Sequence, residues 1–197
     1  MSHFQDLLLT YTQPGADRAL IEQSLWKEFG MTGAVFVLDM SNFSLITQEK
    51  GIVYYLAMIE RMKRVVIPLV ARFSGHIVKF EADNCFAYFS RVSDAIEAGA
   101  HINSAVSQEN QKYPGESDIH VSCGIDFGDF LLINGNDFFG HPVNRASKLG
   151  EDLAEKDEIL ITEEAYNKFD QHRSFRTEPV LFSLSHITIN AYRILYA

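Results

Sequence analysis

Apolar positions along the chain follow two patterns, short continuous runs and longer stripes with helical spacing. Apolar runs of strand length lie at Ala34–Met40, 76–81 and 85–90, and the last two are separated by a tight turn. Stretches with apolar residues three or four positions apart cover about 48–72 and 92–112, which predicts two long helices. The first half of the chain therefore reads as strand, helix, hairpin, helix.

Turn residues divide the second half of the chain into shorter elements. Strands are predicted at 118–128 and 129–135, with Gly135-Asn136 as the turn that follows. A helix is expected from about 138 to 154, with Pro142 near its first turn. A buried strand, a short helix and closing strands complete the pattern.

A separate helical pattern precedes the first strand. The turn signal Gln13-Pro14-Gly15 closes a short, partly apolar segment, and the spacing after it predicts a helix over Ala16–Phe29. We interpret this helix as a packing element or, alternatively, as a contact with a partner chain. Neither an internal repeat nor a linker follows, so we expect an N-terminal helical extension over 1–32 and one domain over 33–197.

The order of the predicted elements indicates the fold class. Strand, helix, strand, strand, helix, strand is the ferredoxin-like βαββαβ order, with helices on one face of a largely antiparallel sheet. The prediction is therefore an α+β fold with this core, extra C-terminal strands and an N-terminal helix. A length of 197 residues is sufficient for one such domain with a full core.

Composition narrows the classes of partner. The chain is 47% hydrophobic and 22% charged, with a formal net charge of -9, so it should repel nucleic acid and anionic membranes. Cys85 and Cys123 both lie in strand-like runs, which indicates buried thiols in a reducing compartment. The N-terminus lacks signal-peptide features and no apolar run is long enough to span a bilayer. We expect a cytoplasmic protein that binds neither nucleic acid nor membrane.

Two carboxylates lie where the predicted fold brings strand ends together. Asp39 ends the first apolar run, directly before small polar residues and a helix, and Asp83 lies in the turn of the adjacent hairpin. Converging carboxylates can hold two divalent metal ions beside phosphate groups. Taken singly, Asp39 is also typical of a helix N-cap and Asp83 of a turn residue. The pair favours a metal site.

Other nucleotide and hydrolase signatures are absent from the sequence. It contains neither a G-x-x-x-x-G-K-[ST] loop nor a G-x-G-x-x-G sequence after a strand, and it has no G-x-S-x-G motif. The histidines have no metal-ligand spacing. P-loop, dinucleotide-binding and α/β-hydrolase functions are therefore excluded.

Three spaced segments resemble the catalytic core of class III nucleotidyl cyclases. They are VLDMSNFS from Val37, VKFEADN from Val78 and DFFGHPVNRASK from Asp137. The corresponding motifs of that family read D-x-x-G-F-[ST], K-x-x-G-D and D-x-x-G-x-x-V-N-x-A-x-R. The resemblance covers about 34–162 and implies conversion of ATP or GTP to the 3′,5′-cyclic monophosphate and pyrophosphate, in a homodimer with the active site at the interface.

The resemblance assigns metal and phosphate roles by position. Asp39 and Asp83 would hold two Mg²⁺ or Mn²⁺ ions, with the carbonyl of Met40 as a further ligand. Backbone amides at the start of the following helix would bind the β- and γ-phosphates. The residues that carry these amides are Asn42, Phe43 and Ser44.

The remaining roles fall on residues that a second subunit would supply. Lys79 and Asp137 would read the base, and because adenine offers an acceptor at N1 and a donor at its amino group, this pair favours ATP. Asn144 would orient the ribose. Lys148 stands where the family has an arginine that stabilises charge on the α-phosphate. Arg145, one position along the helix from Asn144, points elsewhere and is not a substitute.

Several positions depart from the family pattern. Asn42 and Ala82 replace glycines, the segment 128–140 is shorter than usual, and Glu81 either pairs with Lys79, adds a carboxylate to the metal site or faces solvent. The hypothesis is a homodimeric adenylate cyclase. The alternative is a cyclase-like module that binds nucleotide or a partner without turnover. A guanylate cyclase is the third possibility.

Overall fold

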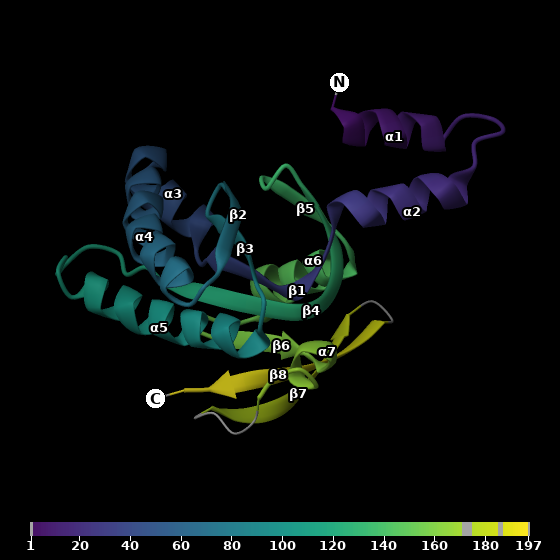
Figure 1. Ribbon diagram of the computed structural model, residues 1–197. Coiled ribbons are helices and arrows are strands. Elements are labelled where there is room, and N and C mark those ends of the chain that lie inside the picture. The colour runs from purple at the N-terminus through teal and green to yellow at the C-terminus, as the bar shows by residue number, and fades with distance from the viewer. Residues whose placement is uncertain (1, 171–174, 185–186, 197) are drawn as a thin grey trace.

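A mixed β-sheet runs through the centre of the molecule (Figure 1). The computed structural model describes residues 2–170, 175–184 and 187–196. Within these residues the strands follow the order β2-β3-β1-β4-β6-β8-β7, and β5 pairs with β4 beside this path. The strands are β1 (Gly30–Met40), β2 (His76–Glu81), β3 (Asn84–Phe89), β4 (Val121–Ile133), β5 (Asp137–Phe139), β6 (Ile159–Thr162), β7 (Arg176–Leu184) and β8 (Ile187–Leu195).

The helices connect these strands on both sides of the sheet. They are α1 (His3–Tyr11), α2 (Arg18–Phe29), α3 (Phe43–Lys50), α4 (Ile52–Arg72), α5 (Val92–Asn110), α6 (His141–Ser147), the π-helix η1 (Lys148–Leu153) and α7 (Glu163–Tyr166). Strands β2, β3, β1 and β4 with α4 and α5 form the predicted βαββαβ core. The α+β class and the ferredoxin-like core are therefore confirmed.

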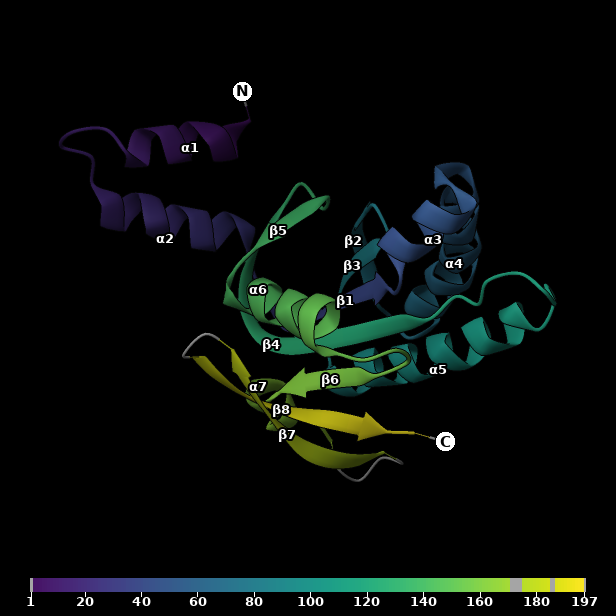
Figure 2. The same cartoon turned by 180° about the vertical axis from the view of Figure 1, so that it is seen from behind.

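Strand β1 is buried on both faces because its apolar run is continuous. Phe36 and Leu38 belong to the core cluster that α4 and α5 cover. Val35 and Val37 belong to a second cluster, which includes Val143 of α6. Figure 2 views the molecule from the side on which α6 lies across β1 and β4. The two helices of the core, α4 and α5, share one face as expected, and α6, outside the core, covers the other face of this uninterrupted apolar strand.

Two predicted strands are one strand in the structure. The segments 118–128 and 129–135 were expected to be separate, but β4 runs without a break from Val121 to Ile133. Gly128 and Asp129 remain paired with Gly33 and Thr32 of β1. The long partner strand β1 holds β4 in register through a sequence that resembles a turn.

The predicted helix over 48–72 begins earlier and is interrupted. Gly51, with φ +86°, separates α3 from α4, whereas Pro68 lies inside α4 and does not end it. The buried stripe also differs from the expected one, because Ile52 and Leu56 are 49% and 52% exposed and Tyr55 is fully buried. Starting the helix after Gly51 rotates Tyr55 into the core.

The N-terminal segment forms two helices where one was expected. A capping box between Ser2 and Gln5 starts α1, and α2 follows from Arg18 with Ile21 and Leu25 buried. Figure 1 shows α1 beside α2, projecting beyond the end of the sheet. Strand β1 begins at Gly30, so the domain division at 32/33 stays a prediction.

The predicted closing strands correspond to β7 and β8. Residues 185–186 and 197 of that segment lie outside the described residues. Among the residues that the structure does describe, no helix has the length and apolar character needed to cross a membrane.

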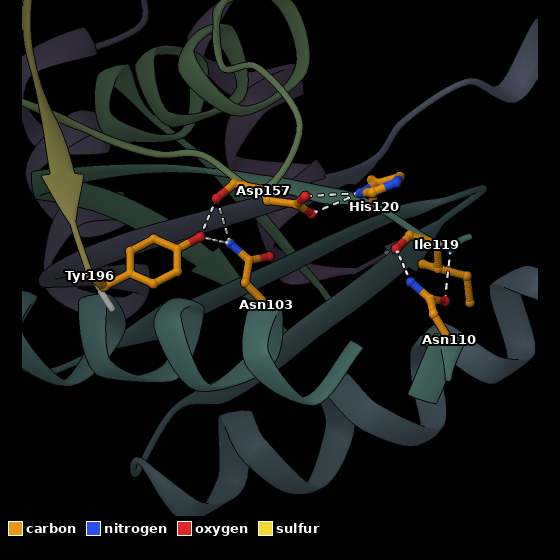
Figure 3. A network of polar contacts seen from close by, with 6 residues as sticks. All are labelled: Asn103, Asn110, Ile119, His120, Asp157 and Tyr196. Carbon is orange, nitrogen blue, oxygen red and sulfur yellow. Dashed lines mark hydrogen bonds and ion pairs between the residues drawn. The ribbon is translucent and has the colours of Figure 1, made fainter. Parts of the chain in front are cut away.

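A polar network joins the start of β4 to α5 and to the C-terminal side of β8 (Figure 3). His120 pairs with the Asp157 carboxylate at 2.9 Å, and the Asp157 carbonyl accepts hydrogen bonds from Asn103 and Tyr196. The His120 carbonyl accepts a hydrogen bond from the backbone N–H of Ser41 at 3.0 Å. The network therefore fixes the point at which the chain leaves β1.

The turn between β2 and β3 contains backbone strain that a substitution can relieve. Ala82 has φ +50°, in a two-residue turn between the paired residues Glu81 and Asn84. Glycine adopts this conformation without a Cβ clash, so Ala82→Gly should raise the free energy of unfolding by about 0.5–1 kcal/mol. Thermal unfolding should show a melting temperature about 2–3 °C higher.

The control for this prediction is Ala87→Gly in the middle of β3. Ala87 is fully buried within β3, where glycine loses more conformational entropy and leaves a void. This variant should melt below the wild-type protein. An Ala82→Gly protein that also melts lower would contradict the strain at the hairpin.

Candidate functional site

The site begins at the end of β1. Asp39 pairs with Ser122 of β4, so its side chain lies on the same face as Val37 and points to the side that α6 covers. Partial burial and, after it, the negative charges of Asp83 and Glu151 together raise the pKa of Asp39 to about 7. The fold therefore holds this carboxylate in a position where it is costly to ionise without a cation.

A buried tyrosine ties the second carboxylate to the end of β1. Asp83 lies in the β2–β3 turn, and the hydroxyl of Tyr55 donates to its Oδ2 at 2.7 Å. The same hydroxyl lies 3.5 Å from the carbonyl oxygen of Met40. The structure thus brings Asp39 and Asp83 together at the exit of β1, close enough for their charges to interact.

The donor set at this point suits a hard divalent cation. It consists of the carboxylates of Asp39 and Asp83 and the carbonyl of Met40, and oxygen donors of this kind are those that Mg²⁺ and Mn²⁺ prefer. Across 2–170, 175–184 and 187–196, no three His, Cys, Asp or Glu side chains are arranged to hold an ion together. Such a site would leave coordination positions for water and phosphate oxygens. The metal-binding role of these residues stays a prediction.

The segment after Met40 presents backbone amides. Asn42 is the N-cap of α3 with φ +73°, and its side chain makes no capping hydrogen bond. Asparagine tolerates this left-handed conformation, which accounts for it at the family's glycine position. The first-turn amides that follow, at Phe43 and Ser44, have no partner within the helix. A helix start of this kind favours phosphate groups, and the assignment of these residues stays a prediction.

The predicted base-reading pair comes from the interior of β2 and the first position of β5. Lys79 Nζ is 3.1 Å from Asp137 Oδ1 and 3.0 Å from Glu81 Oε2. The hydrogen bond with Glu81 raises the pKa of Lys79, so the amine stays charged. The structure therefore brings Lys79 and Asp137 together, and of the alternatives for Glu81 it shows pairing with Lys79.

The predicted helix over 138–154 is divided into β5, α6 and η1. Asn144 is exposed on α6, and Lys148 opens η1, where its Nζ lies 2.5 Å from Asp152 Oδ2. Within the described part of the chain, no hydrogen bond or ion pair joins either residue to Asp39 or Asp83. The part of these two residues in the expected site stays a prediction.

Arg145 has a structural partner. Its Nε donates to the buried carboxylate of Asp126 at 2.6 Å, and it also pairs with Glu164. Asp126 further accepts a hydrogen bond from Thr162. The guanidinium thus links α6 to β4 and α7, which agrees with the expectation that Arg145 does not stand in for Lys148.

Two glycines bring α6 and η1 directly onto the sheet. A Cβ on Gly124 would lie 2.0 Å from the carbonyl oxygen of Ala146 and 2.4 Å from the backbone nitrogen of Gly150. A Cβ on Gly150 would lie 2.8 Å from the carbonyl oxygen of Val37. Only glycine permits this approach, which places η1 beside the end of β1.

Three residues at the site were not identified from the sequence. Tyr55 lies at a buried position of a helix. The signal that could have identified it is its hydroxyl group within an otherwise apolar stripe, because a buried tyrosine hydroxyl usually has a hydrogen-bond partner. Ser122 and Glu151 meet the end of β1 only after β4 and η1 have packed. Neither shows a motif or spacing that would have singled it out.

The comparisons with known proteins agree with this geometry. No protein-family model matches the sequence. A Rhizobium meliloti (strain 1021) protein named "Putative adenylate cyclase 3" is 25% identical over 130 residues, which cover 66% of this chain. The matched segment is 22% of that relative, so the chain spans about a fifth of its length.

Solved structures share the fold. The adenylate/guanylate cyclase/hydrolase from Silicibacter pomeroyi superposes with a TM-score of 0.73 and 24% identity, over 85% of this chain and 98% of its own. The guanylate cyclase domain of RhGC from Catenaria anguillulae, in complex with GTP, superposes with a TM-score of 0.70 and 18% identity, over 83% and 96%. The resemblance to class III nucleotidyl cyclases is confirmed, and the chain has the fold of their catalytic domains.

The raised pKa of Asp39 predicts how stability depends on pH. Because this pKa is about 7 in the folded protein and about 4 in an unfolded chain, the folded state favours the protonated carboxyl. The free energy of unfolding should therefore fall as pH rises from about 4 to about 7. Asp39→Asn removes this pH-dependent loss of stability. In EDTA at pH 8, the melting temperature of this variant should be at least about 3 °C above that of wild type.

The same two proteins at pH 5 provide the internal comparison. At pH 5 Asp39 is largely protonated in the folded state but mostly ionised in the unfolded chain, so the difference in melting temperature should shrink to about a third of its value at pH 8. Glu49→Gln, at an exposed position, controls for the change in net charge and should track wild type throughout. A pH-independent difference for Asp39→Asn would contradict the raised pKa.

Proposed function

We propose that this chain is a nucleotidyl cyclase catalytic domain that converts ATP to 3′,5′-cyclic AMP and pyrophosphate. The observation that carries the proposal is the convergence of Asp39 and Asp83 at the exit of β1, held by Tyr55. The fold and the motif resemblance support it. In the reaction, the ribose 3′-oxygen forms a bond to the α-phosphorus, the bond to pyrophosphate breaks and the hydroxyl loses its proton.

The metal half of the site would consist of Asp39, Asp83 and the Met40 carbonyl. Two Mg²⁺ or Mn²⁺ ions, when bound, would neutralise phosphate charge and favour ionisation of the attacking hydroxyl. The hydroxyl of Tyr55 holds Asp83 in position from inside the core. Backbone amides at the start of α3 would bind the terminal phosphates, because a helix N-terminus attracts anions.

The residues on α6 and η1 would act on the sugar and the α-phosphate. Asn144 would orient the ribose by hydrogen bonding. Lys148 would stabilise the charge that develops on the α-phosphate, as a point charge without the two-pronged grip of arginine. To reach substrate, Lys148 has to exchange its ion pair with Asp152 for one with phosphate.

Base selection follows from the ion pair between Lys79 and Asp137. A lysine donates to adenine N1, and a carboxylate accepts from the 6-amino group. Guanine presents a donor and an acceptor in the reverse order. The two side chains lie 3.1 Å apart, so one purine edge can face both, which supports ATP over GTP.

A homodimer would complete the site. In one chain, no ion pair or hydrogen bond between described residues joins Lys148 to Asp39 or Asp83. A second copy can place its Lys148 opposite the Asp39 of the first, and twofold symmetry would then generate two equivalent sites. The free, buried thiols of Cys85 and Cys123 support the expected reducing, cytoplasmic location.

The second candidate is a cyclase-like module that binds nucleotide without turnover. The observation that favours it is Lys148, which replaces an arginine and is paired with Asp152. Such a module would be stabilised thermally by ATP and Mn²⁺ yet release no product. A guanylate cyclase remains the third candidate, and its product would be cyclic GMP.

The first test is a product assay with matched variants. Purified protein incubated with ATP and Mn²⁺ should form cyclic AMP, identified by chromatography. Asp39→Asn and Lys148→Ala should each lower kcat by at least about 100-fold, since each removes an interaction with the transition state. An equimolar mixture of the two inactive variants should recover about a quarter of wild-type activity, because half of the dimers then contain one intact site.

The outcomes of this assay separate the three candidates. ATP-dependent thermal stabilisation without product would support the binding module. Cyclic GMP as the main product would support a guanylate cyclase. Normal turnover by Asp39→Asn would contradict the metal assignment, and no recovery on mixing would contradict the shared site.

The second test concerns the base. The double variant Lys79→Glu, Asp137→Asn presents an acceptor and a donor in the order that guanine requires. Its ratio of kcat/KM for ATP over GTP should fall at least about tenfold, because buried polar groups of a purine lose their partners when the pattern is reversed. Glu81→Gln, which removes a competing partner of Lys79, should leave the preference for ATP in place. An unchanged ratio in the double variant would exclude this pair as the base reader.

A further inference from the structure

Glu151 reaches the end of β1 through the backbone of η1. Ser122, the cross-strand partner of Asp39, donates its hydroxyl to the carbonyl oxygen of Gly150 at 2.9 Å. Cross-strand partners have their side chains on one face of the sheet. The residue after Gly150 therefore lies beside the Asp39 carboxylate.

The π-helical turn fixes this placement. The backbone N–H of Ala154 donates to the carbonyl of Leu149, five residues back, at 2.8 Å. Gly150 at the centre of the turn has no room for a Cβ against Val37 and Gly124. Single π turns of this kind occur frequently at functional sites. The position of Glu151 is thus set by close backbone packing.

The side chain of Glu151 has a defined orientation and an uncompensated charge. The Ser147 side chain forms a hydrogen bond with it. The next acid, Asp152, is neutralised by Lys148 at 2.5 Å, whereas among the described residues no cation pairs with Glu151. Its negative charge acts on Asp39 and is in turn influenced by Asp83.

Glu151 is not placed to be a direct ligand. No described group of three His, Cys, Asp or Glu side chains can hold an ion together, so the carboxylate lies outside the donor set of Asp39 and Asp83. An exposed carboxylate whose charge acts on Asp39 can accept a hydrogen bond from a metal-bound water and add negative charge near the cation.

We propose that Glu151 is a positioning residue for the divalent cation, which strengthens binding at Asp39 and Asp83 through metal-bound water and charge. This inference rests on the proposed function, because it requires the Asp39 and Asp83 metal site. It adds a residue that none of the three cyclase motifs contains. The position depends on the π turn and on the close packing of Gly150.

Titration of the full chain with Mn²⁺ alone, with free Mn²⁺ followed by electron paramagnetic resonance, tests the proposal without turnover. Glu151→Gln removes the charge and keeps the shape, and it should raise the Kd for Mn²⁺ about tenfold. Ser147→Ala keeps the charge and removes the orienting hydrogen bond, so its effect should be smaller. Glu155→Gln, with the same change in net charge just beyond η1, should stay within about twofold of wild type.

Salt dependence distinguishes an electrostatic role from a structural one. The ratio of Kd values between Glu151→Gln and wild type should shrink as NaCl rises from about 50 mM to about 500 mM, because salt screens an exposed charge. A ratio that is independent of salt, or a Kd for Glu151→Gln equal to that of wild type, would overturn the proposal. Thermal unfolding without metal verifies that each variant is folded.

Asp39→Asn separates this inference from the proposed function. If wild type binds Mn²⁺, Asp39→Asn does not and Glu151→Gln binds as wild type does, the inference alone fails. If wild type and Asp39→Asn bind Mn²⁺ equally, or neither binds it, the metal site itself fails and the inference fails with it.

Discussion

The close approach of two glycines determines how the two halves of the candidate site are placed on the sheet. Gly124 of β4 and Gly150 of η1 meet at backbone distance, and a Cβ on either would overlap main-chain atoms. This contact lets α6 and η1 lie flat on the face formed by β1 and β4. Asn144, Lys148 and Glu151 therefore belong to one layer that packs on this face. Their positions relative to Asp39 follow from backbone packing and require no flexible loop.

A second constraint is electrostatic. Asp39 lies at the point where a fully buried strand reaches the surface, and burial and Asp83 raise its pKa to about 7. Tyr55 keeps Asp83 in place with a hydrogen bond from the core. Without a cation, this arrangement costs stability, because like charges are held together in a partly desolvated position. Residues retained at such a cost are typical of binding and catalytic sites.

Much of the fold and part of the site could be predicted from the sequence. The continuous run before Asp39 and the turn at Asp83 placed both carboxylates at strand ends, and the resemblance to the cyclase motifs singled out Lys79 and Asp137, which the structure brings together. The pairing of β4 could not be predicted, since Gly128 and Asp129 have turn chemistry and are held in register only by β1. Tyr55 was missed because the phase of α4 depends on the break at Gly51.

The sequence by itself determined the order of elements, the α+β class and the residue types available to the site. These properties depend on periodicity and on local backbone preferences, which a chain expresses without its neighbours. Tertiary structure alone decided that helices cover both faces, that Lys148 pairs with Asp152 and that Glu151 lies beside Asp39. These residues are distant in sequence and come together only through packing. The close approach of Gly124 in β4 to Gly150 in η1 fixes how the two elements pack. No local pattern encodes such a match, because it exists only once both elements are in place.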